Sequence, residues 1–198
     1  MSVEYRSSIM INHNPDQLIE IFNRLFIAHY NTRLDYSEGE PIYLPADETD
    51  KHNRVLFAHG FFASALHEIS HWCIAGEARR QLVDFGYWYE PDGRNAEQQR
   101  EFEQVEIKPQ AIEWILTKSV GRQFNISTDN LDADPAVIAT GREAFAQNVV
   151  KQVKKYLQNG LPLRAAILKK ALLDYYQINK EFNVDDFQLS EVIDTQPS

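Results

Sequence analysis

The chain has 198 residues, of which 43% are hydrophobic and 12% aromatic, which is enough for a single domain over residues 1–198 with a sizeable core. Its 29 acidic and 20 basic side chains give a net charge of -9, which argues against direct nucleic-acid binding, since phosphate contacts need clustered lysine and arginine. No apolar run reaches the ~18 residues of a membrane span, and the first residues lack the apolar core of a secretion signal. With Cys73 as its single cysteine, the chain is expected to be a cytoplasmic protein that does not bind membranes.

The first part of the chain predicts one helix followed by a loop-rich segment. Asn14 and Pro15 supply a cap and a first turn for a helix over residues 16–30, in which apolar side chains recur at helical spacing. Residues 31–54 contain turn signals around a short apolar piece, and we expect a loop there with at most one strand. Residues 55–59 are expected to form a strand or a loop.

The middle of the chain predicts two helices separated by a strand. A mostly apolar run predicts a helix over residues 62–75, which ends before Gly76. Aromatic residues then predict a strand over residues 83–89, closed by a Pro-Asp-Gly turn. A second helix follows over residues 95–119. Pro109 is expected to kink it or to make it restart, because proline lacks the backbone donor and clashes one turn back.

The last part of the chain predicts two more helices, over residues 135–158 and 163–178. An acidic C-terminal tail follows from about residue 180, and we expect it to be loosely ordered at its end. The expected fold class is therefore α+β, a mostly helical single domain with a few short strands and a metal site between two helices.

The strongest chemical signal is the sequence HEISH within the helix over residues 62–75. Residues four apart lie on the same face of a helix, so His67 and His71 can bind one cation, and Glu68 could serve as a catalytic base beside it. Such a pair is often only polar surface. Here the neighbours are largely apolar, and buried imidazoles without a ligand would leave polar nitrogens unsatisfied, which favours a metal ion.

A reactive metal site needs a third protein ligand, because it typically uses three and keeps a position open. The helix over residues 95–119 offers one stripe of polar side chains, namely Glu103, Glu106, Gln110 and Glu113. A solvated acidic face is the alternative interpretation of this stripe. We choose Glu106 over Glu103 because the apolar neighbours Val105 and Ile107 suggest that the backbone is more enclosed there.

Asp84 and His59 are the reserve ligands, and His59 could equally be a core histidine or a hydrogen-bond partner that orients a ligand. The aromatic run after Asp84 could line a pocket, with Asp84 and Asp92 at its edge. The alternative is a strand with one face in the core. We assign no role to Cys73, because a buried thiol on a helix usually only fills space.

Long segments of the chain resemble a known family. They read PIYLPAD, then RVLFAHGFFASALHEISHWCIAGEARRQLVDFGYWYEPDGR, then FEQVEIKPQAIEW. Together they resemble the elongation factor P hydroxylase family of proteobacteria, from about Phe22 to near Leu157. The resemblance implies an oxygen-dependent enzyme that hydroxylates a lysine side chain of translation elongation factor P, after a β-lysyl group has been attached to that lysine.

The resemblance also implies a metal site of two histidines and one carboxylate, which we carry over to His67, His71 and Glu106. The reaction implies iron(II) with dioxygen as co-substrate, since zinc has no redox chemistry. Glu68 would then orient water, move a proton or hold a substrate ammonium group. We further hypothesise that Asp84 attracts the cationic arm of the β-lysylated factor.

Two other classes of function stay open on the sequence. The first is a zinc-dependent hydrolase of the HExxH type; its metzincin form is disfavoured, because Ile74 and Glu77 stand where that longer motif has glycine and histidine. The second is an adaptor that binds a translation factor around a closed metal site with four ligands. Oxygen consumption would distinguish the hydroxylase from both.

Overall fold

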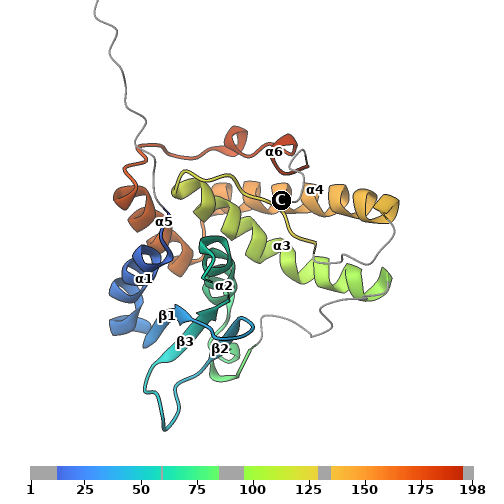
Figure 1. The fold of residues 1–198 in the computed structure, drawn as a ribbon. Coiled ribbons are helices and arrows are strands. Elements are labelled where there is room, and N and C mark those ends of the chain that lie inside the picture. Colours follow the sequence, from blue (N-terminus) through green and yellow to red (C-terminus); the bar gives the residue numbers. More distant parts are fainter. Residues whose placement is uncertain (1–12, 59, 85–95, 129–134, 194–198) are drawn as a thin grey trace, which may run out of the picture.

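The computed structural model describes residues 13–58, 60–84, 96–128 and 135–193, and its small three-stranded sheet lies at one edge of the helices, beside the first two α-helices (Figure 1). The elements in chain order are α1 (Pro15–Tyr30), β1 (Thr32–Tyr36), β2 (Ile42–Leu44), β3 (Asn53–Phe57), α2 (Phe62–Ile74), the 3₁₀ helix η1 (Arg79–Gln81), α3 (Ala96–Ser119), α4 (Pro135–Asn159), α5 (Leu163–Tyr175), the 3₁₀ helix η2 (Val184–Asp186) and α6 (Ser190–Ile193). The predicted α+β class and mostly helical single domain are confirmed. No helix in these described ranges is both long and apolar enough to cross a bilayer.

The first helix begins and ends where local sequence signals put it. The Asn14 side chain accepts a hydrogen bond from the Asp16 backbone N–H at 3.0 Å, and Pro15 occupies the first turn. The helix ends at Asn31, whose φ of 48° lies in the left-handed region that asparagine tolerates. The predicted helix over residues 16–30 is confirmed as α1.

The sheet has the strand order β1-β3-β2, in which β3 is parallel to β1 and antiparallel to β2. The expectation of a loop with at most one strand over residues 31–54 was wrong, because both β1 and β2 lie there. Each is short, and each is held by pairing with β3, as when Leu34 and Tyr43 flank Val55. Such long-range pairing leaves little trace in local sequence patterns.

The helix α3 runs without interruption through Pro109, so of the two expected outcomes, a kink or a restart, the restart was wrong. Every residue over 109–117 is buried, because neighbouring helices cover both of its faces. This packing outweighs the missing backbone hydrogen bond of proline. In Figure 1, α3 crosses the middle of the molecule, with α2 on one side and α4 on the other.

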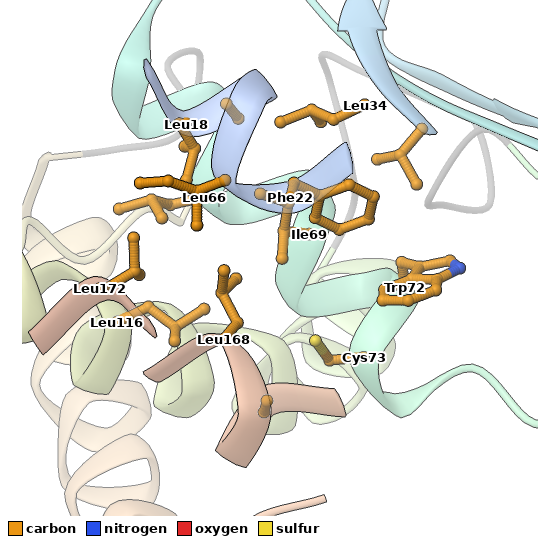
Figure 2. Close-up of a cluster of buried hydrophobic side chains, with 14 of the residues drawn as sticks. Leu18, Phe22, Leu34, Leu66, Ile69, Trp72, Cys73, Leu116, Leu168 and Leu172 are labelled. Carbon is orange, nitrogen blue, oxygen red and sulfur yellow. The ribbon is translucent and has the colours of Figure 1, made fainter. Parts of the chain in front are cut away.

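Two hydrophobic cores lie on opposite sides of α3. The first joins α1, α2, α5 and the sheet, and Figure 2 shows side chains of the helices meeting there, among them Leu18, Phe22, Leu66, Ile69, Leu116 and Leu168. The second core lies between α3, α4 and the C-terminal segment. The first part of the predicted tail packs against this core, since Phe182, Phe187 and Val192 are buried in it, and residues 194–198 lie outside the described residues.

The C-terminal end of α2 is tied to α5 by the buried side chain of Arg164. Its Nη2 donates to the carbonyl oxygens of Trp72, Cys73 and Ala75 at 2.8, 3.1 and 2.6 Å. Its guanidinium also stacks over the Trp72 ring, 4.6 Å from the centroid. The last carbonyls of a helix lack partners within the helix, so a cation at this position satisfies them and favours the helix dipole.

We expect Arg164→Ala to lower the free energy of unfolding by about 3 kcal/mol, because it leaves several buried carbonyl oxygens without a donor. Urea denaturation of the purified protein measures this change. Lys170→Ala is the matched control, since it removes a cation from an exposed position on the same helix. Equal stability of the two variants would contradict the role given to Arg164.

Candidate metal centre

The two histidines of the HEISH sequence lie on the face of α2 that points toward α3. The opposite face of α2 is buried in the first core through Leu66, Ile69 and Cys73. Packing of that apolar face fixes the rotation of the helix, and α2 and α3 are in close contact along their lengths. The Nε2 atoms of His67 and His71 lie 3.1 Å apart, so both rings are directed at one point.

Glu106 of α3 completes a group of three donors. Its Oε1 lies 3.0 Å from His71 Nε2, and its Oε2 lies 3.9 Å from His67 Nε2. One donor atom from each of these residues lies within 4.8 Å of the other two. The carboxylate is only 1% exposed, and the Oε1 contact with His71 Nε2 does not have the geometry of a hydrogen bond. A buried charged oxygen without a hydrogen bond is costly, and a divalent cation between the three donors would satisfy it.

A second carboxylate holds one of the histidines in place. Glu113, two turns after Glu106 on α3, places its Oε2 2.8 Å from His67 Nδ1. A carboxylate on Nδ1 fixes the ring and leaves Nε2 directed at the metal position, as is usual for histidine ligands. Gln110 lies between them and donates its Nε2 to Glu106 Oε2 at 3.0 Å. One stripe of α3 therefore carries both a candidate ligand and the groups that contact the candidate ligands.

We expect Glu113→Ala to weaken metal binding by about 10–100-fold, because His67 loses the partner that orients its ring. Glu113→Gln should fall between that variant and the unchanged protein, since an amide can still contact Nδ1 but carries no charge. Calorimetric titration of the metal-free protein with cobalt(II) measures both. The exposed Glu101 on the same helix gives the control Glu101→Ala, and a similar loss there would remove Glu113 from this role.

Burial and opposite charges shift the proton affinities at this centre. Burial lowers the pKa of His67, but Glu106 and Glu113 outweigh it and raise that pKa well above its usual value. For Glu106, burial raises the pKa, but the charges of His71 and His67 outweigh burial and lower the pKa to about 2. Burial raises the pKa values of Glu68 and Glu113. Without a metal ion, the cluster thus holds a proton on His67.

We expect metal binding to release about one proton, because protonated His67 has no lone pair to offer. The raised pKa of His67 favours the proton, so apparent metal affinity should fall by about tenfold per pH unit as the pH drops below that pKa. Titration calorimetry at pH 7 in two buffers of different ionisation enthalpy counts the proton. A heat that does not depend on the buffer would contradict this prediction.

The centre borders a small cleft of about 150 Å³. Glu68 and His71 of α2 line it, together with Arg79 and Arg80 of η1. Asp84 lines the same cleft and is held there by backbone hydrogen bonds with Tyr43, of 2.7 and 3.0 Å. The volume lies far below the ~300–1,000 Å³ of drug-sized ligand pockets, so it suits a narrow chain rather than a bulky group.

Comparisons with known proteins identify the family to which the chain belongs. The family described as "Elongation factor P hydroxylase" matches residues 21–187 of the chain. The chain is also 48% identical over 180 residues to a protein of Haemophilus influenzae named "Elongation factor P lysine hydroxylase", and the alignment covers 91% of this chain and 99% of that protein. The chain belongs to the elongation factor P hydroxylase family. The resemblance inferred from the sequence is confirmed, and the family match extends beyond Leu157.

The structure distinguishes Glu103 from Glu106, the two glutamates compared from the sequence as the third ligand. Glu103 lies one turn before Glu106, but its carboxylate accepts a hydrogen bond from Gln99 and faces Gly141 of α4. It is not part of the histidine cluster. His59, the aromatic residues of the predicted strand after Asp84, and Asp92 lie outside the described residues. Val83 and Asp84 are described, and Asp84 forms an isolated bridge to Tyr43 of β2.

Several groups of this candidate centre were not predicted from the sequence. Glu113 and Gln110 were noticed only as rivals of Glu106, although their spacing of three and four residues puts all of them on one face. Arg79 and Arg80 also line the cleft, and no local motif marks them. Cys73 is buried, and burial raises its pKa to about 12, which disfavours the reactive thiolate.

Proposed function

We propose that this chain hydroxylates a lysine side chain of elongation factor P after a β-lysyl group has been added to it, in the cytoplasm. The observation that carries the proposal is the relative named for this activity, which is 48% identical over 99% of its own length. The close approach of two imidazoles and a buried carboxylate supports it, because three such ligands on one side of an ion leave positions open for a reaction.

His67, His71 and Glu106 would hold the metal ion. Bound iron(II) would supply the redox chemistry with dioxygen that zinc cannot. The carboxylate of Glu113 would keep His67 oriented toward the ion. Glu68 lies beside His71 in the wall of the cleft, and since burial raises its pKa, it is suited to hold or move a proton there.

The cleft would receive the modified lysine as an extended cationic arm. Glu68 and Asp84 both line it, so carboxylates lie on more than one wall. A partly buried carboxylate attracts an ammonium group more strongly than an exposed one, because water screens it less. These residues would position the arm beside the metal ligands, and the rest of the factor would remain outside the narrow cleft.

The mass of elongation factor P from cells with and without this protein tests the proposal. We expect the factor to be heavier by one oxygen atom when the protein is present, and the purified enzyme to consume oxygen with the β-lysylated factor. A factor of unchanged mass would overturn the proposal. Metal-dependent activity without oxygen consumption would instead support the zinc hydrolase.

A further inference from the structure

Two opposite charges face each other in the cleft beside the metal ligands. Arg79 donates from Nε and from Nη2 to the carboxylate of Asp84, with a distance of 3.1 Å from Nη2 to Oδ1. The two side chains differ in exposure, since that of Arg79 is 58% exposed and that of Asp84 only 22%. The cation thus covers the anion from the solvent side of the cleft.

The backbone holds the two partners to different degrees. Asp84 is fixed by both of its backbone hydrogen bonds to Tyr43, and the Tyr43 hydroxyl donates to the Arg80 carbonyl at 2.9 Å. Arg79 sits on the three-residue helix η1 and extends a long, exposed side chain. Holding a long, mostly exposed side chain in an ion pair costs side-chain entropy and is weakened by solvent, so a substrate ammonium group can compete with the guanidinium for the carboxylate.

We propose that Asp84 is a binding site for a substrate ammonium group and that Arg79 is a resident cation which this ammonium group displaces. The proposal rests on the proposed function, in which the arm of the modified lysine carries amines. A half-buried carboxylate favours a cation at all times, and Arg79 supplies one while the cleft is empty. An arm without a positive charge gains nothing at Asp84 and cannot replace Arg79. The pair therefore selects cationic arms.

Binding of the β-lysylated factor to the metal-loaded protein, measured without oxygen, tests this exchange. We expect Asp84→Asn to weaken binding by about tenfold, because a charge-assisted contact is lost. Arg79→Gln should tighten it by about threefold, since the weak competing pair is gone. The double variant should bind like Asp84→Asn alone. Arg24→Gln removes the same charge from an exposed position on α1 and is the matched control.

Weaker or unchanged binding by Arg79→Gln would overturn the proposed displacement of Arg79. The ion pair with Asp84 would then only stabilise the structure of the cleft. Tightening of equal size in Arg24→Gln would also overturn the displacement, because bulk charge would then explain the effect. The simple diamine 1,5-diaminopentane is the second probe. If 1,5-diaminopentane gives the same order of binding affinities among the variants while the factor is never hydroxylated, the proposed function fails and the ammonium site stands. If hydroxylation occurs but no variant alters binding, the ammonium site fails alone.

Discussion

Replacing either His67 or His71 with alanine is expected to abolish metal binding and hydroxylation while the fold survives. Each ring supplies one of three donors within 4.8 Å of one another, so its loss leaves an incomplete site. Changes to groups that merely orient a ligand cost about 10–100-fold in metal affinity, and removal of a ligand should cost at least about 100-fold. Metal analysis of the purified variants measures the loss.

The fold should survive because the packing of α2 depends on its other face, where Leu66, Ile69 and Trp72 are almost wholly buried. Circular dichroism on both variants checks this. His29→Ala is the matched control, since it removes an imidazole from an exposed position on α1. Full iron occupancy in either His67→Ala or His71→Ala would remove the histidine pair from the site.

Local signals predicted the helices, whereas pairing between distant segments escaped them. The cap at Asn14 and the helical spacing of apolar residues over 16–30 both act within a few turns, so the sequence displays them directly. The pairing of β1 with β3 joins Leu34 to Val55, some twenty residues later, and five-residue strands offer too few positions for a clear alternation. The predicted helix over residues 163–178 was also too long at its end, because α5 ends at Tyr175 and Gln177 has a φ of 55°.

The site could be predicted in part, because helical periodicity carries real geometric information. The spacing of His67 and His71 put both on one face of α2, and the structure places them together. Glu106 was chosen because Val105, Ile107 and the following Pro109 suggested an enclosed backbone. Pro109 is buried, but Val105 is 54% exposed. What brings Glu106 to the histidines is the rotation of α3, which the two cores on its sides determine. That rotation depends on the whole fold and is not visible in the neighbours of one residue.

The HEISH sequence by itself is also typical of zinc peptidases, and two histidines with one glutamate can hold zinc as readily as iron. The geometry of the three donors does not distinguish these metals. The comparisons do not favour the hydrolase, since both the family and the relative carry hydroxylase names. This chain therefore carries a motif typical of zinc peptidases, although the family and the relative that its sequence matches are named for hydroxylation.

A comparison of two glutamates on α3 tests the third ligand. We expect Glu106→Ala to lose metal as completely as the histidine variants, because it removes a donor that lies 3.0 Å from His71 Nε2 and is 1% exposed. Glu103→Ala should keep metal affinity within about threefold, since changes away from a site usually stay within ~0.5 kcal/mol. Iron content and hydroxylation rates of both variants give the measurement.

Glu103 is a close control for Glu106, because both are glutamates one turn apart on the same helix and differ in the side to which they point. The Glu103 carboxylate contacts Gln99 and faces α4, whereas that of Glu106 faces α2.

Glu106→Gln adds a second comparison, since it keeps the size of the side chain and the Gln110 contact but removes the charge. Iron loss in Glu106→Ala and Glu106→Gln together would mean that the charged donor matters, rather than the space it fills. If Glu103→Ala lost iron and Glu106→Ala kept it, the ligand set would be His67, His71 and Glu103, and α3 would have to rotate relative to α2 to bring Glu103 to the histidines.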